Sequence, residues 1–249
     1  MSPARQAAAP RAIGFDLGET LLTYAGTPLN WAALYPDALA RVAAACGAAP
    51  TPADLDRAIQ RLRQANTRLH PRAREIRAEE LFADLLADWG RPADAAETRR
   101  ALEAFFGFFQ RRMQPYPDTA PALAALRARG LRLGVLTDVP YGMPREFVER
   151  DLAGAGLTAC LDTLLTSGEV GWRKPEPAGF HALAARLEAD ASTLWYVGNE
   201  EKDIRGALAA GLTAVLIDRD RQRPAWGQHH TVSDLRALPE LVETTAAST

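Results

Sequence analysis

The sequence predicts an α/β fold in which a mostly parallel, Rossmann-like sheet is interrupted by an inserted all-helical domain. Two observations predict it. Near the start of the chain, and again in its second half, short apolar runs end at polar residues and alternate with helical patterns, as expected for parallel strands joined by helices. From about residue 30 to residue 112, apolar residues instead recur with the helical period, and no segment has the pattern of a strand.

Each predicted strand is a short apolar run that stops at polar or turn-forming residues. These runs are residues 12–15, 131–137, 163–166, 194–197 and 214–217. Helices are expected between them at 120–129, 146–152, 179–187 and 203–210. Four further amphipathic stretches, separated by glycine and proline, are 31–46, 52–69, 76–89 and 93–109. Residues 1–22 and 115–249 therefore form one discontinuous core domain, and residues 23–114 form a helical cap domain.

Composition excludes several classes of partner. The formal net charge of −2 gives no broad electrostatic attraction to nucleic acid or to an anionic membrane. No apolar run approaches the roughly 20 residues of a membrane span, and residues 1–10 lack the apolar core of a secretory signal. Cys46 and Cys160 lie far apart inside apolar segments, which is typical of core residues in a reducing compartment. We expect a cytoplasmic protein without nucleic-acid or membrane partners.

Polar side chains follow the predicted strands where each strand ends. In open parallel sheets, ligands bind in the crevice outside the carboxyl ends of the strands. The residues expected at this edge are Asp16, Gly18, Thr20, Thr137, Asp138, Arg173, Lys174, Asn199, Glu200, Glu201 and Asp203. A carboxylate, a hydroxyl, an ammonium group and an acidic cluster at one sheet edge can together hold Mg²⁺ and a phosphoryl group.

Four of these segments resemble the motifs of the haloacid dehalogenase superfamily of hydrolases. FDLGETL at 15–21 is similar to the first motif, VLT at 135–137 to the second, RKPEP at 173–177 to the third and VGNEEKD at 197–203 to the fourth. They occur in the family's order, each after its own predicted strand, and they cover nearly the whole core domain. The insert between the first two motifs matches the position and helical character of the family's first cap type.

The resemblance implies phosphoryl transfer through a covalent intermediate. Asp16 is then the nucleophile that forms an aspartyl-phosphate, Thr137 bonds a phosphoryl oxygen, and Lys174 neutralises charge. Lysine occurs only at Lys174 and Lys202, so a lysine at the third motif is better explained by a compact point charge than by solubility. The substrate, a small phosphorylated metabolite, is expected to contact Gly18, Asp138 and Arg173. Mg²⁺ is expected at Asp16, the Gly18 carbonyl, Asn199, Glu200 and Asp203.

Two positions depart from the family pattern. The aspartic acid usually found two residues after the nucleophile, which acts as general acid, is replaced by Gly18. Glu19 either substitutes for it or points away from the cleft, and substrates with good leaving groups need the acid least. The fourth motif has Asn199 in place of a metal-binding aspartate. Its later acids, Glu200 and Asp203, either bind metal or cap a helix.

These departures leave two alternatives open. One is a metal-independent 2-haloacid dehalogenase, in which Asp16 displaces halide from carbon, because those relatives also lack the second aspartate and have asparagine in the fourth motif. The other is a non-catalytic module that keeps the fold for binding or regulation. Retention of Asp16, Thr137 and Lys174 together favours an enzyme, and the three acids after Gly198 suit a cation better than a carboxylate substrate.

Overall fold

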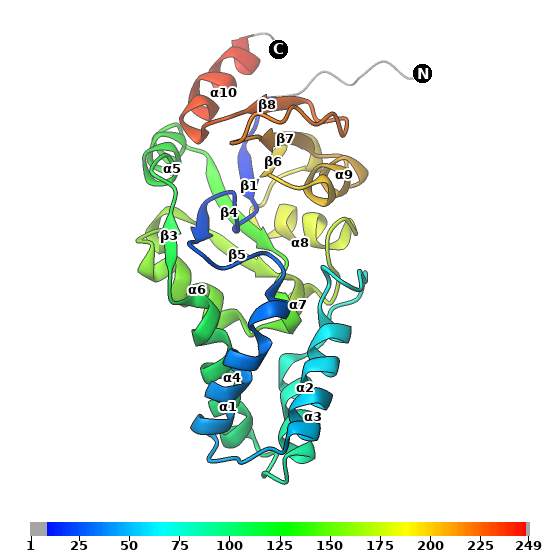
Figure 1. Cartoon of the computed structure of the whole chain (residues 1–249). Coiled ribbons are helices and arrows are strands. Elements are labelled where there is room, and N and C mark those ends of the chain that lie inside the picture. The colour runs from blue at the N-terminus through cyan, green and yellow to red at the C-terminus, as the bar shows by residue number, and fades with distance from the viewer. Residues whose placement is uncertain (1–8, 248–249) are drawn as a thin grey trace. The chain divides into compact units, whose positions relative to one another are not determined.

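Six parallel strands form the central sheet, in the order β5-β4-β1-β6-β7-β8 (Figure 1). The computed structural model of the protein describes residues 9–247. The strands are β1 (Ala12–Phe15), β4 (Arg132–Thr137), β5 (Thr163–Thr166), β6 (Leu194–Gly198), β7 (Thr213–Ile217) and β8 (His230–Val232). Every neighbouring pair is parallel. The predicted α/β fold is confirmed.

Helices cover both faces of this sheet. Helices α8 (Ala178–Arg186) and α9 (Glu201–Ala209) contribute Phe180, Leu183 and Ile204 to a buried cluster with strand residues. On the opposite side of the sheet in Figure 1 lie α5 (Thr119–Ala128) and α10 (Leu238–Ala247). Because both faces are buried, β1 and β7 are uninterrupted apolar segments, which is why these strands can be recognised from the sequence.

The register of the central strands brings the predicted motifs to one edge. Strand β1 lies between β4 and β6, and Phe15 is paired with both Val135 and Val197. The next residue, Asp16, donates its backbone N–H to the carbonyl of Val197 at 2.9 Å. Parallel strands end in the same direction, so Asp16, Thr137 and the residues after Gly198 follow the carboxyl ends of three adjacent strands.

Four helices occupy the chain between the first two motifs. They are α1 (Tyr35–Ala45), α2 (Pro52–Ala65), α3 (Ala78–Asp88) and α4 (Ala95–Gln110). Thr51 caps the start of α2: its hydroxyl accepts the N–H of Asp54 while the Asp54 carboxylate accepts the N–H of Thr51. The phenylalanines of α4 are buried, and Phe105 packs against Phe82 of α3 with ring centroids 4.9 Å apart.

The chain divides into two compact units. The core unit consists of the described parts of Met1–Thr23, Gln114–Asp138 and Leu152–Thr249, and the helical unit consists of Tyr24–Met113 and Val139–Asp151. Residues 139–151 were expected in the core domain, but they group with the helical unit. Tyr141 joins the helical unit through its hydroxyl, 2.6 Å from that of Tyr35, and Phe147 of α6 (Arg145–Gly154) packs on Phe106.

Several short elements were not predicted. Strands β2 (Leu22–Tyr24) and β3 (Met113–Pro115) pair in a separate two-stranded sheet, and β8 adds an edge strand to the main sheet. Each contains three residues, too few for a period to be visible. The single-turn helix α7 (Ser167–Val170) begins with a capping box between Thr166 and Glu169. Within residues 9–247, no helix is long and apolar enough to cross a membrane.

Candidate active site

Lys174 joins two carboxylates at the carboxyl edge of the sheet. Its Nζ lies 2.6 Å from Oδ1 of Asp16 and 2.6 Å from Oδ1 of Asp203. It also donates to the hydroxyl of Tyr196 at 3.1 Å and lies 3.4 Å from the carbonyl of Leu136. The structure therefore brings together residues of the first, third and fourth motifs.

Burial makes these charges strongly interdependent. The side chain of Lys174 is 2% exposed and that of Asp203 is fully buried. Burial by itself would lower the pKa of Lys174, but the carboxylates of Asp16 and Asp203 raise that pKa well above its usual value. Burial raises the pKa of Asp16 to about 6, although the Lys174 ammonium group acts in the opposite direction. Lys174 is consequently a permanent cation beside Asp16.

Asp203 is held by the turn that begins α9. Its Oδ2 accepts the N–H groups of Asn199 at 3.1 Å and Glu200 at 2.9 Å, while Oδ1 faces Lys174. A side chain at Gly198 would collide with this carboxylate, because a Cβ built there lies 2.4 Å from the Cβ of Asp203. The glycine of the fourth motif thus makes space for Asp203, which both caps the helix and anchors Lys174.

Lys202 neutralises Asp138, although it was not among the site residues predicted from the sequence. The Nζ of Lys202 lies 3.1 Å from Oδ2 of Asp138 and 3.0 Å from Oε2 of Glu200. The guanidinium of Arg173 lies 3.7 Å from the same Asp138 oxygen, and Oδ1 of Asp138 accepts the backbone N–H of Lys174 at 3.0 Å. Burial would raise the pKa of Asp138, but these cations, with Lys202 first, hold it below its usual value.

Three buried carboxylates therefore face three cations. We call this set the six-charge cluster: Asp16, Asp138, Asp203, Arg173, Lys174 and Lys202. All but Lys202 have side chains that are less than 10% exposed, and that of Lys202 is 27% exposed. Such charges persist in the interior only when paired, and each member of the cluster lies within 3.7 Å of an opposite charge. Glu200, whose side chain is 25% exposed, adds a fourth carboxylate through Lys202. The scarcity of lysine was the one sequence signal that pointed to Lys202.

The loop after Asp16 is fixed by side chains from other elements. The hydroxyl of Thr20 donates to Oδ1 of Asn199 at 3.1 Å, which ties the first motif to the fourth. The guanidinium of Arg219, which stacks over the ring of Tyr116 at 3.7 Å, donates to the carbonyl of Thr20 at 2.7 Å. These contacts join the loop to the fourth motif and to the segment after β7.

Glu19 has a position that sequence reasoning left open. Its backbone φ of 58° is left-handed, and its carboxylate accepts hydrogen bonds from the hydroxyls of Thr23 and Tyr116, each at 2.6 Å. Burial and the Glu19 carboxylate raise the pKa of Tyr116 to about 12, so its hydroxyl keeps its proton and remains the donor. Each carboxylate oxygen of Glu19 thus accepts one hydrogen bond, from Thr23 of β2 or from Tyr116, which follows β3.

Thr137 and Gly18 complete the sequence-predicted residues of the core unit. Thr137 is the last residue of β4 and is 7% exposed. Because Phe15 is paired with Val135, Thr137 lies one residue beyond Leu136, which is level with Asp16. Gly18 lies two residues after Asp16 in the loop, and a Cβ built on it would have no atom within 4 Å. Along the chain, Thr137 directly precedes Asp138 and Gly18 lies two residues after Asp16, and both aspartates belong to the six-charge cluster. The space around the Cβ position of Gly18 is open.

The donor set around Asp16 fits a magnesium ion held by few protein ligands. Within the described residues, Asp16 makes its bonds through Oδ1, which leaves Oδ2 for another partner. Asn199 offers an amide oxygen and Gly18 a backbone carbonyl. In contrast, Asp203 accepts two backbone N–H groups through Oδ2 and is ion-paired with Lys174 through Oδ1, and Glu200 is paired with Lys202. No group of three His, Cys, Asp or Glu side chains in residues 9–247 could hold a metal, but Mg²⁺ needs only one or two carboxylates with waters and substrate phosphate.

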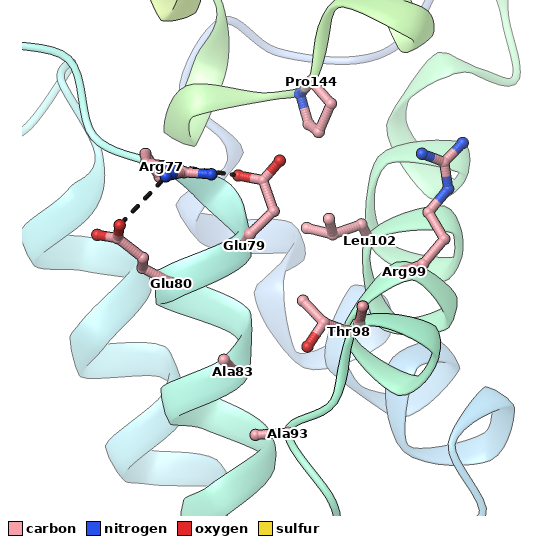
Figure 2. Close-up of a pocket in the computed structure, with 10 residues that line it drawn as sticks. Arg77, Glu79, Glu80, Ala83, Ala93, Thr98, Arg99, Leu102 and Pro144 are labelled. Carbon is pink, nitrogen blue, oxygen red and sulfur yellow. Dashed lines mark ion pairs between the residues drawn. The ribbon is translucent and has the colours of Figure 1, made fainter.

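A separate groove lies within the helical unit. It has a volume of about 500 Å³ and is lined by the apolar side chains of Ala83 and Leu102, with Arg77 and Arg99 at its rim (Figure 2). Arg77 is paired with glutamates of its own helix start, at 3.8 Å from Glu80. None of the residues predicted to be catalytic lines this groove.

Comparison with known proteins agrees with this arrangement of motifs. The family model described as haloacid dehalogenase-like hydrolase matches residues 10–211. The phosphoserine phosphatase of Thermus thermophilus is 40% identical over 164 residues, which are 64% of this chain and 63% of that protein. The (S)-2-haloacid dehalogenase 1 of a Pseudomonas species is 29% identical over 133 residues, or 52% of this chain and 57% of that protein. The chain spans less than two thirds of the length of these curated relatives.

Solved structures show the same fold. The 2-haloacid dehalogenase of Pseudomonas syringae superposes with a TM-score of 0.67 at 24% identity, covering 94% of this chain and 99% of that one. The HAD phosphatase of Thermococcus onnurineus superposes with a TM-score of 0.63, also at 24% identity, covering 93% and 97%. With the family model covering most of the chain, these comparisons show that the protein belongs to the haloacid dehalogenase-like hydrolases.

Proposed function

We propose that the protein is a Mg²⁺-dependent phosphatase that hydrolyses a small phosphorylated metabolite through an aspartyl-phosphate on Asp16. The observation that carries the proposal is the position of Lys174, whose ammonium group bridges Asp16 and Asp203 while leaving the second oxygen of Asp16 unengaged. A carboxylate held in this way is oriented, ionised at neutral pH and able to attack. Curated relatives named as phosphatases support the same activity.

The chemistry assigns distinct roles to the residues. The carboxylate of Asp16 attacks phosphorus, the bond from phosphorus to the leaving oxygen breaks, and water then attacks the phosphorus of the aspartyl-phosphate to regenerate Asp16. Lys174 offsets the negative charge that develops on the transferred group, and the hydroxyl of Thr137 donates to one of its oxygens. Asp203 keeps the Lys174 ammonium group in place during both steps.

The protein residues proposed to hold Mg²⁺ are Asp16, the carbonyl of Gly18 and Asn199. When bound, the ion would supply positive charge that lowers the repulsion between the Asp16 carboxylate and an anionic substrate. We propose Glu200 and Asp203 as its outer neighbours, because their carboxylates are already engaged with Lys202, Lys174 and backbone N–H groups. The helical unit is proposed to be the cap that selects the substrate.

One observation favours a second candidate, the metal-independent 2-haloacid dehalogenase. Each charge of the six-charge cluster is paired with a protein group of opposite charge, as a site without a metal requires. In that reaction Asp16 would attack carbon and release halide, forming an ester that water hydrolyses. The two candidates share the nucleophile and differ in substrate and in the need for a cation.

A panel of substrates separates the two. Phosphate release from acetyl phosphate, p-nitrophenyl phosphate and sugar 1-phosphates is measured with Mg²⁺ and with EDTA, and chloride release from 2-chloropropionate is measured in parallel. Mg²⁺-dependent phosphate release that disappears in Asp16→Asn, but not in the exposed control Asp190→Asn, supports the phosphatase. Chloride release that is unaffected by EDTA identifies the dehalogenase instead. No turnover of either kind contradicts both assignments and leaves the non-catalytic module.

A further inference from the structure

The position two residues after the nucleophile has room for a side chain that the protein does not provide. Gly18 has a φ outside the left-handed region, and a Cβ built on it would meet no atom within 4 Å. Neither the backbone conformation nor contacts at the Cβ position therefore require glycine here. The absence of a side chain consequently bears on the chemistry of the site.

The neighbouring acid is turned toward other partners. Glu19 accepts hydrogen bonds from the hydroxyls of Thr23 and Tyr116 at 2.6 Å each, and its backbone φ of 58° is held by an N–H to the carbonyl of Leu22 at 2.7 Å. Two short hydrogen bonds from hydroxyl groups fix the carboxylate in place. Reaching a leaving group would require both bonds to break, so Glu19 does not substitute for the missing acid.

The other carboxylates next to the nucleophile are also engaged. Asp203 accepts two backbone N–H groups and pairs with Lys174, and Asp138 pairs with Lys202 and accepts the N–H of Lys174. Glu200 pairs with Lys202 at 3.0 Å. Within the described core unit, each carboxylate near Asp16 therefore serves as an acceptor for protein donors, and none is positioned as a proton donor to a substrate.

We infer that the site acts on acyl phosphates, that is, mixed anhydrides of a carboxylic acid and phosphate, and hydrolyses alkyl phosphates slowly. This inference rests on the proposed phosphatase function. As the bond from Asp16 to phosphorus forms, the bond from phosphorus to the leaving oxygen breaks and its electron pair stays on that oxygen. A carboxylate leaves as a stable anion without taking a proton, whereas an alkoxide requires one from a general acid. The site supplies the nucleophile and the positive charge but no proton for the leaving oxygen, so the substrate needs a leaving group that departs as a stable anion.

A series of leaving groups tests this directly. The substrates are acetyl phosphate, p-nitrophenyl phosphate, phenyl phosphate and benzyl phosphate, which share the phosphoryl group and span carboxylate, phenolate and alkoxide leaving groups. We expect kcat/KM to fall steeply along this order in the natural protein. General acid catalysis contributes about a hundredfold or more in rate, so the step from phenyl to benzyl phosphate, which are similar in size, is expected to be at least about a hundredfold.

The matched variants are Gly18→Asp and Gly18→Asn, which place side chains of equal size in the same space. We expect Gly18→Asp to raise the ratio of benzyl to p-nitrophenyl phosphate hydrolysis by about a hundredfold and Gly18→Asn to leave that ratio unchanged, because the amide is not an acid. Circular dichroism of both variants shows whether they fold.

Each outcome has a distinct meaning. Benzyl phosphate hydrolysed as fast as phenyl phosphate by the natural protein overturns the inference while leaving the phosphatase intact. A folded Gly18→Asp variant that still hydrolyses p-nitrophenyl phosphate, but keeps the natural ratio, also overturns it, because the steepness then has another cause. Lack of activity toward acetyl phosphate and every ester, under conditions where Mg²⁺ is present, overturns the proposed function itself.

Discussion

The ammonium group of Lys202 lies 3.1 Å from one carboxylate oxygen of Asp138, and the other oxygen of that carboxylate accepts the backbone N–H of Lys174. Lys202 is thus linked to Lys174 through the side chain of Asp138. We expect Lys202 to act as a positioning residue, which can be tested separately from Asp16, Thr137 and Lys174.

Replacement of Lys202 by Met is expected to lower kcat by about 10- to 100-fold with a smaller change in KM, since residues that orient site ligands have effects of this size. In this variant the buried carboxylate of Asp138 loses the positive charge of Lys202. Steady-state kinetics of Lys202→Met, Lys202→Arg and the double variant Lys202→Met with Asp138→Asn measure the coupling. Arginine is expected to restore part of kcat, and the double variant is expected to lose less than the sum of its two single changes. Strict additivity would contradict the positioning role.

Asp203→Asn is expected to reduce kcat by more than about tenfold while the protein remains folded. The amide oxygen still accepts backbone N–H groups at the start of α9, but the negative charge that holds Lys174 is lost. Activity is measured together with the midpoint of urea unfolding. The exposed replacement Asp190→Asn is the control, and an Asp203→Asn variant with natural kcat would show that Lys174 does not depend on this anchor.

Gly198→Ala is expected to destabilise the protein by about 1–3 kcal/mol, because the added Cβ overlaps the side chain of Asp203. Gly107 offers a matched control in α4, where a Cβ would meet no atom within 4 Å. Gly107→Ala is expected to stabilise the protein by about 0.5–1 kcal/mol, as alanine is the better helix former. Equal effects of the two changes on urea unfolding would be inconsistent with the close contact at Gly198.

Asp151 gives the stability of the helical unit a predictable pH dependence. Burial raises the pKa of Asp151, although hydrogen bonds from Tyr24 and Gln110 act in the opposite direction. The folded state therefore binds this proton more tightly than the unfolded state. Its stabilising contribution is fully present below the unfolded pKa, about 3.9, and is lost as the pH rises through the higher folded pKa.

The test compares urea midpoints of the natural protein and Asp151→Asn at pH values from acidic to neutral. We expect the natural protein to lose stability relative to Asp151→Asn as the pH increases over this window. A difference between the two proteins that stays constant, or that changes in the opposite direction, would show that burial does not dominate at Asp151.

Much of the fold could be predicted because its strands are long enough and buried on both faces. Strand β5 has the predicted bounds, and β4 begins one residue later than expected. The grouping of residues 139–151 with the helical unit could not be predicted, because it depends on tertiary contacts, such as that of Tyr141 with Tyr35, which local periodicity does not contain.

The site could be predicted only as far as its residues lie in motifs. Asp16, Lys174 and Asp203 meet as the strand ends predicted. The partners of Glu19 could not be foreseen, because Tyr116 is 97 residues away and its hydroxyl reaches Glu19 only in the folded chain. The role of Asp203 as a partner of Lys174 likewise depends on three-dimensional geometry, since either a cap or a metal ligand fits its place in the sequence.

The pairing of charges in the six-charge cluster has a consequence for how substrate and Mg²⁺ affect each other's binding. A substrate phosphoryl group would add two negative charges to a site whose buried carboxylates and cations are already paired, which is unfavourable in a medium of low dielectric constant. One divalent cation would offset those two charges. Substrate and Mg²⁺ are therefore expected to bind as mutually dependent ligands, each increasing the affinity for the other by the same factor. Weak binding of either alone would then follow from the pairing of the site's own charges, and it would keep Asp16 paired with Lys174 until both ligands are present.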